Sequence, residues 1–165
     1  MSNIRLISTK NGLLLSIFSL RFPKSDRLLG AQILASVLGS KIYKNPIVEI
    51  GWYLIQATNY WKEHPLFEDI NQPLSVFHWH GDTFDLPKGT THLARSKACE
   101  NQVFFQRNVI GLQIHLEMTV PGAKELISNG SDEMVDGPCT QNQETILKKT
   151  ILATQMPECI FYCQN

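Results

Sequence analysis

Runs of apolar residues separated by polar breaks predict a chain of strands interspersed with a few short helices. Arg107 and Asn108 predict a tight turn, so the strands on either side of them form a hairpin. Asn45 and Pro46 predict another turn. An apolar run at residues 13–20 predicts a buried strand or helix. The main strand candidates are rich in aromatic and β-branched residues; they cover residues 47–57, 74–80, 91–95, 102–106 and 109–117.

Three helices are predicted from helical spacing and from start and stop signals. Residues 30–39 form the first, and Gly39 suits its left-handed end. Pro121 opens the second, at a position where a missing N–H costs nothing. The third covers residues 143–155 and ends before Pro157. Strands interspersed with helices favour an α/β layered domain. The residues predicted to give the first and third helices their apolar sides are Ile33, Leu34, Val37, Leu38, Ile146, Leu147, Ile151 and Leu152.

Composition and charge narrow the range of functions. The 165 residues are 43% hydrophobic, which suits one globular domain, and 15 basic residues balance 15 acidic ones. Without a field of either sign, we expect no nucleic-acid or membrane partner. The run at residues 13–20 is too short to span a bilayer and is followed by no small-residue cleavage site. The four cysteines are too sparse for a disulfide framework and suit free thiols in the cytoplasm.

A histidine and a glutamate two residues apart carry the most suggestive chemistry. On an extended chain His115 and Glu117 point from the same face. A carboxylate beside an imidazole fixes its tautomer, and the imidazole can then activate a nucleophile. Taken alone, the motif is weak evidence for catalysis, since polar side chains at a half-exposed strand end give the same sequence pattern. His78 and His80 also alternate on one strand face, and with His115 they could form a metal triad.

An ordered set of motifs resembles the class I (triad) glutamine amidotransferases, especially stand-alone members and those like the amidotransferase domain of GMP synthase. That family has a nucleophile elbow, a middle H-G-D segment and a late G-L-Q-F-H-x-E segment. The counterparts here are Asp26–Gln32 (DRLLGAQ), His80–Asp82 (HGD) and Gly111–Glu117 (GLQIHLE). Four shorter segments also resemble the family: Glu49–Trp52, Leu86–Gly89, Asn101–Phe104 and Met118–Thr119. The resemblance runs to the end of the last helix. We therefore expect a divergent segment over residues 1–27, a partial amidotransferase domain over 28–157 and a tail over 158–165.

The resemblance implies a flavodoxin-like three-layer α/β/α fold, incomplete at the N-terminal side of its sheet. In such enzymes a thiolate attacks the side-chain amide of glutamine, ammonia leaves, and the γ-glutamyl thioester is hydrolysed. His115 would be the general base and acid, and Glu117 would orient it. The resemblance to the family at this segment accounts for His78 and His80 without a metal ion, so we expect no bound metal. No dinucleotide fingerprint or P-loop is present in the sequence, so we expect no cofactor. The residues that would line the substrate site are Gly30, Gln32, Trp79, His80 and Gly81.

The sequence departs from the family where the nucleophile belongs. Counting back from Gly30-Ala31-Gln32, the family's cysteine falls on Leu28, which has no lone pair for attack. Only 27 residues precede Leu28, and they contain neither a Gly-Gly loop nor a continuous apolar strand leading into the elbow. We expect an N-terminally truncated and catalytically inactive member of the family.

Two other interpretations remain open. The chain could be a non-catalytic module that binds glutamine, or one that regulates or contacts other proteins. It could also be part of a split enzyme, with a protein partner that supplies the missing strands.

Overall fold

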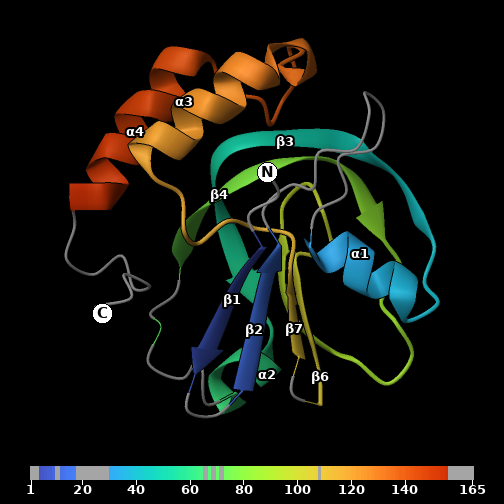
Figure 1. Ribbon diagram of the computed structural model, residues 1–165. Helices are drawn as coiled ribbons and strands as arrows, with labels where there is room; N and C mark the ends of the chain where they lie inside the picture. Colours follow the sequence, from blue (N-terminus) through green and yellow to red (C-terminus); the bar gives the residue numbers. More distant parts are fainter. Residues whose placement is uncertain are drawn as a thin grey trace.

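The computed structural model describes residues 4–9, 12–17, 30–64, 67, 70, 73–107 and 109–155, the first two ranges by their backbone. Within them one sheet of seven strands is accompanied by helices, so the predicted α/β class is confirmed (Figure 1). The strands are β1 (Ile4–Thr9), β2 (Gly12–Ile17), β3 (Ile42–Ala57), β4 (Leu74–Phe84), β5 (Thr91–Ser96), β6 (Val103–Gln106) and β7 (Val109–Leu112). The helices are α1 (Gly30–Val37), α2 (Asn59–Glu63), α3 (Val120–Asn129), the 3-10 turn η1 (Ser131–Glu133) and α4 (Gln143–Gln155).

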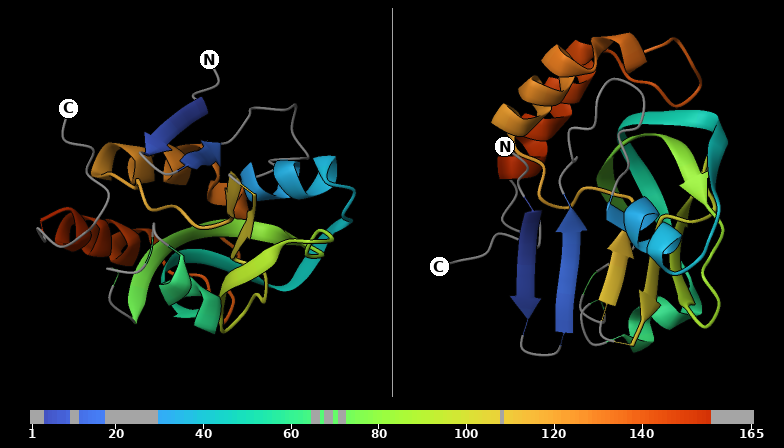
Figure 2. Two further views of the ribbon diagram at one scale, coloured as in Figure 1. Left: turned by 90° about the horizontal axis from the view of Figure 1, so that it is seen from below. Right: turned by 45° about the vertical axis from the view of Figure 1, so that its right-hand side comes forward.

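The sheet has the strand order β1-β2-β7-β6-β5-β3-β4. Its strand pairs are antiparallel, except that β2 runs parallel to β7. Figure 2 shows β1 and β2 continuing the sheet beside β7, and Figure 1 shows β3 and β4 arching beneath α3 and α4. Part of the apolar run at residues 13–20 therefore forms strand β2, and residues 18–20 lie outside the described part of the chain.

The helices pack on the sheet through three clusters of apolar side chains. Helix α1 buries Ala31 and Ala35 against Phe84 and Phe104. Helix α2, which the sequence analysis missed, inserts Trp61 into a second cluster. Helices α3 and α4 cover β3 and β4 through a third cluster. Its buried members are Ile50, Trp52, Phe77, Trp79, Met118, Ala123, Ile127 and Ile146.

Two predicted turns have different outcomes. Strands β6 and β7 pair as the expected hairpin, and Arg107 between them has a φ of 54°; Asn108 lies outside the described residues. The turn predicted at Asn45-Pro46 is wrong, because both residues lie inside β3, which begins at Ile42. The β3–β4 register is irregular between Lys44 and Glu49. Proline has no N–H for a ladder bond, so it is tolerated at such an irregularity.

The predicted apolar faces of α1 and α4 need correction. Helix α1 buries Gly30, Ala31, Gln32 and Ala35, whereas Val37 is 78% exposed. In α4 Ile146 is buried as expected, but Ile151 and Leu152 are 43% and 50% exposed. Small residues let α1 approach the sheet closely, which spacing of large apolar residues does not reveal. Gly39 does adopt the left-handed conformation expected after α1, with a φ of 86°.

The strand predicted over residues 109–117 is too long. Strand β7 ends at Leu112, and beyond it the chain crosses to β4, where His115 forms an isolated antiparallel bridge with Phe77. Helix α3 then begins as predicted, with Pro121 in its first turn and the Thr119 hydroxyl accepting a hydrogen bond from the Gly122 N–H. None of the described helices is both long and apolar enough to cross a membrane.

Candidate functional site

His115 and Glu117 form a close pair between β7 and α3. Nδ1 of His115 lies 3.0 Å from Oε1 of Glu117, and both side chains are largely buried. The backbone fixes this place, since the His115 N–H donates to the Phe77 carbonyl over 2.8 Å. The predicted contact between the two side chains is confirmed. The expected strand geometry is not, because the contact arises on the irregular segment after β7.

The surroundings of Glu117 favour its ionised, carboxylate form. Burial by itself raises the pKa of Glu117, but the hydrogen bond from His115 and the charge of that ring outweigh burial and lower it. The ionised carboxylate can only accept, so His115 donates through Nδ1. This contact leaves Nε2 as the ring nitrogen that can exchange a proton with a nucleophile, which is the arrangement a general base needs.

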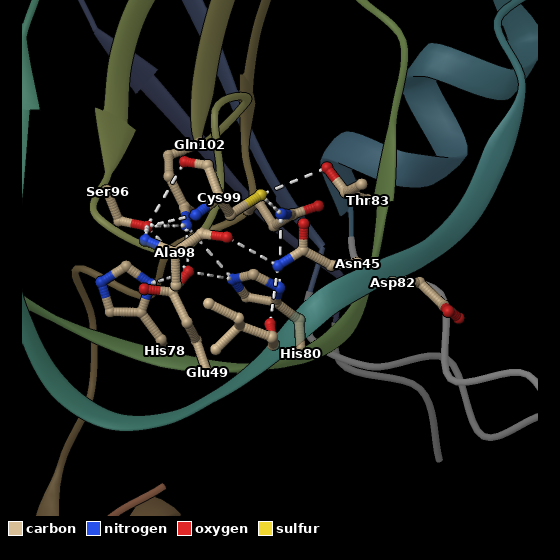
Figure 3. A network of polar contacts seen from close by, with 12 residues as sticks. Asn45, Glu49, His78, His80, Asp82, Thr83, Ser96, Ala98, Cys99 and Gln102 are labelled. Atoms are coloured by element: carbon tan, nitrogen blue, oxygen red, sulfur yellow. Dashed lines mark hydrogen bonds and ion pairs between the residues drawn. The ribbon is translucent and has the colours of Figure 1, made fainter. Parts of the chain in front are cut away.

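A second polar cluster lies between α1 and strands β3 and β4 (Figure 3). Gln32, in the first turn of α1, is almost fully buried, and its Nε2 donates to the Asp82 carbonyl at 3.0 Å and to Gln113 Oε1 at 3.2 Å. Gln113 Nε2 lies 3.4 Å from His80 Nδ1, and His80 Nε2 lies 3.3 Å from Glu49 Oε2.

The direction of this chain of hydrogen bonds follows from its end at Asp82. A backbone carbonyl only accepts, so the Gln32 amide must present its nitrogen there. Gln113 then offers its oxygen to Gln32 and its nitrogen to His80. His80 therefore accepts at Nδ1 and carries its proton on Nε2, towards Glu49.

Glu49 is the acceptor at the other end of the chain. Its Oε2 accepts from Ser96 Oγ at 2.9 Å and from Gln102 Nε2 at 2.6 Å. Burial raises the pKa of Glu49, but the hydrogen bond from His80, the charges of His78 and His80, and the Ser96 hydroxyl together lower it. Sequence reasoning gave Glu49 no role. The available signal was a carboxylate inside an otherwise apolar strand.

The remaining predicted substrate residues are spread over these elements. Gly30 begins α1, and Gly81 lies next to His80 in β4. Trp79 is buried and donates from Nε1 to Glu133 Oε2 at 2.8 Å. The side chains of Gln32 and His80 are internal and bonded to other residues, and their role in holding glutamine remains a prediction. Leu28 lies outside the described residues.

The two cysteines in the described part of the chain are poor nucleophiles. Cys99 is buried, its Sγ contacts Thr83 Oγ1 at 3.2 Å and Gln113 Nε2 at 3.3 Å, and burial raises its pKa. Burial also raises the pKa of the partly exposed Cys139. A raised pKa leaves little thiolate at neutral pH, and the thiolate is the nucleophilic form.

Comparison with known proteins extends this description. The family model described as Glutamine amidotransferase class-I matches residues 29–134. The glutamine amidotransferase-like protein YfeJ of Salmonella typhimurium is 38% identical over 109 residues, which cover 66% of this chain and 46% of YfeJ. The glutamine-hydrolysing GMP synthase of Syntrophomonas wolfei is 29% identical over 62% of this chain and 20% of its own length.

Solved structures give the same result. A glutamine amidotransferase from Thermotoga maritima has a TM-score of 0.61 and 34% identity, over 73% of this chain and 50% of its own. A glutamine amidotransferase from Methylobacillus flagellatus has a TM-score of 0.63 and 28% identity, over 73% and 51% of the two chains. These matches are consistent with a partial flavodoxin-like fold. The chain thus spans about half or less of the length of these relatives. From the family match across residues 29–134, the chain belongs to the class I glutamine amidotransferase family.

Proposed function

We propose that the chain is a class I amidotransferase domain that keeps the histidine–carboxylate pair but lacks glutaminase activity. The observation that carries the proposal is the leucine at position 28, two residues before the Gly30-Ala31-Gln32 text that the family places after its nucleophile. The family match begins at residue 29, directly after this position. The 3.0 Å contact of His115 with Glu117 supports the view that the rest of the hydrolytic machinery persists.

The chemistry of the family reaction explains why one residue is decisive. Hydrolysis of the glutamine amide proceeds through a thioester, which needs a thiolate within hydrogen-bond reach of the base. His115 can accept a proton at Nε2 and Glu117 can stabilise the resulting imidazolium, but leucine has neither a proton to give nor a lone pair to attack. Cys99 offers no substitute, because it is buried among other partners and its pKa is raised.

A glutaminase assay on the purified chain tests the proposal. Ammonia and glutamate released from glutamine are measured for the wild type and for His115→Ala. We expect both to remain at the background level. Ammonia release by the wild type that His115→Ala abolishes would show that the chain is an active enzyme and would refute the proposal.

Restoring a thiol tests the claim that the base is still competent. We expect Leu28→Cys to react with a glutamine analogue that carries an electrophile at the γ-position, with one adduct per chain found by mass spectrometry. The double variant Leu28→Cys, His115→Ala should react at least about tenfold more slowly, because general-base assistance contributes roughly 10²–10⁴-fold. The matched control is Leu29→Cys, with a thiol one residue away. Equal labelling of Leu28→Cys and Leu29→Cys would place the nucleophile position elsewhere.

The second candidate function is glutamine binding without hydrolysis. It is motivated by the presence of Gln32 and His80, two residues that the family resemblance assigns to the glutamine pocket and that one chain of hydrogen bonds connects. Calorimetric titration with glutamine distinguishes the two: saturable binding that Gln32→Leu weakens supports a binding module, and no heat of binding rejects it.

A further inference from the structure

Three potential metal ligands meet in the interior, where β3 and β4 pair. Glu49 is the register partner of His80, and His78 lies two residues before His80 on the same face of β4 (Figure 3). Glu49, His78 and His80 are 1%, 0% and 4% exposed, so the group is shielded from water. This set differs from the triad considered from sequence, since Glu49 replaces His115.

The spacing of the three side chains suits a single ion. One ligand atom from each lies within 4.8 Å of the other two. Oε2 of Glu49 lies 3.3 Å from His80 Nε2 and 3.8 Å from His78 Nδ1. Two ligands of one tetrahedral zinc ion lie roughly 3.3 Å apart, given bonds of about 2.0–2.1 Å. The distance between Glu49 and His80 already matches this value. The distances that involve His78 must shorten through rotation of the side chains.

His78 provides the observation that points to a ligand. Neither of its ring nitrogens makes a well-formed hydrogen bond within the described residues, although the Tyr53 backbone lies close enough to influence its titration. Buried polar atoms without a partner are costly and need a physical explanation. A bound cation supplies one.

The charge of the group is also suitable. Each of the two imidazoles offers a ring nitrogen and Glu49 offers a carboxylate oxygen, which is the one anionic donor of the set. A divalent transition ion reverses the sign of that charge and offers all three donors a strong partner. Two imidazoles with one carboxylate form a ligand set that zinc accepts and that leaves a fourth position open.

We propose that Glu49, His78 and His80 bind one zinc-like divalent cation, through Glu49 Oε2, His78 Nδ1 and His80 Nε2. The site is independent of the glutaminase question, because neither Leu28 nor His115 belongs to it. Binding moves the His80 proton from Nε2 to Nδ1. There the Gln113 side chain lies 3.4 Å away, and it accepts this proton only by turning its amide and giving up the hydrogen bond from Gln32. A ligating histidine usually has such an outer partner.

The competing explanation is a purely structural cluster in which Glu49 is held by its hydrogen bonds to Ser96 and Gln102. It predicts that His78 can be replaced by an apolar ring of similar size at little cost, and that no metal binds. The two explanations therefore differ in metal content.

Metal binding is measured on the full chain, unfolded in chelator and refolded with ZnCl₂ or CoCl₂. We expect about one equivalent of bound metal and, with cobalt, visible absorption of a tetrahedral site. His78→Phe keeps an aromatic ring at this position and removes both nitrogens, and Glu49→Gln removes the anionic ligand. Each substitution should lower the affinity for the metal at least about tenfold. That is the smallest loss seen when only the outer hydrogen-bond partner of a metal ligand is removed. His64→Gln, on a partly exposed histidine outside the group, is the matched control and should bind as the wild type does.

Two results would overturn the proposal. The first is a wild type that refolds without retaining metal after gel filtration, which needs no variant. The second is a folded His78→Phe or Glu49→Gln that binds metal as tightly as the wild type. Circular dichroism establishes folding, and if one variant does not fold, the other variant and the wild-type stoichiometry decide the matter.

Discussion

Replacing Glu49 by glutamine tests whether the buried carboxylate acts as a charged acceptor. Its Oε2 accepts short hydrogen bonds from Ser96 and Gln102 and lies 3.3 Å from His80 Nε2. Hydrogen bonds to a charged group contribute roughly 1.5–3 kcal/mol, against about 0.5–1.5 kcal/mol for neutral ones. Glutamine keeps one side-chain oxygen and loses the charge. With about 1 kcal/mol lost at each of the two short bonds, Glu49→Gln should lower the free energy of unfolding by roughly 2 kcal/mol.

Urea unfolding at pH 7 in the presence of a chelator measures this difference without a contribution from metal. Glu100→Gln is the matched control, because it removes the same charge from a side chain that is 63% exposed. Surface changes of this kind stay within about 0.5 kcal/mol. Equal unfolding midpoints for Glu49→Gln and Glu100→Gln, with equal slopes, would refute the idea that the buried charge stabilises the fold.

The pH dependence gives a second test on the same two proteins. The pKa of Glu49 is lowered in the folded chain. Its contribution to stability is therefore complete above the pKa of the unfolded chain and is lost as pH falls through the lower folded value. Glutamine does not titrate. The stability gap between wild type and Glu49→Gln should shrink as pH falls below about 4.3, the ordinary glutamate value. A gap that widens on acidification would contradict the lowered pKa.

Three further changes test other parts of the structure. Gly111→Ala should cost roughly 1–3 kcal/mol in urea unfolding, because the added Cβ would lie 2.4 Å from a buried phenylalanine ring. Gly81→Ala, whose Cβ meets its nearest neighbour at 3.5 Å, is its control. Thr150→Val should cost about 1–3 kcal/mol, since the buried Trp52 indole N–H loses its 2.9 Å acceptor; an unchanged midpoint would contradict that bond. Glu117→Gln should change the ring ¹⁵N shifts of the adjacent histidine, because the carboxylate that fixes its tautomer is gone; unchanged shifts would show that the tautomer is set elsewhere.

Much of the fold follows from local pattern. The aromatic and β-branched runs at β4, β5 and β6 place these strands within a few residues of their observed bounds, and Pro121 marks the start of α3. These signals succeed because each depends on one element and its burial. The α/β class follows from the order of such elements.

The errors arise where partners distant in sequence decide the structure. Leu112, Ile114 and Leu116 continue the alternation of β7, yet the chain leaves that strand, because the His115 N–H bonds to Phe77 on β4. Pro46 looks like a turn residue, but the register irregularity of β3 accommodates it. Alternation reports which residues are apolar and carries no information on which strand supplies the hydrogen bonds.

The candidate site also contains one group that the sequence reveals and one that depends on strands distant in sequence. His115 and Glu117 could be found from sequence, because two residues on one extended segment carry the whole contact. The group of Glu49, His78 and His80 could not, since it depends on the pairing register of β3 with β4. A glutamate between two apolar residues of a predicted strand was a sign of a buried charge. The identity of its partners needs the structure.

The contact between His115 and Glu117 does not by itself imply catalysis. Their hydrogen bond satisfies a largely buried carboxylate whatever residue occupies position 28, and the lowered pKa of Glu117 means that the bond favours the folded chain at neutral pH. On the proposed function, a leucine in place of the thiol would remove the chemistry but leave that stabilisation unchanged. The pair can thus persist in an inactive chain for reasons of stability alone, and only a reaction that requires both His115 and a nucleophile at position 28 measures what remains of the enzyme.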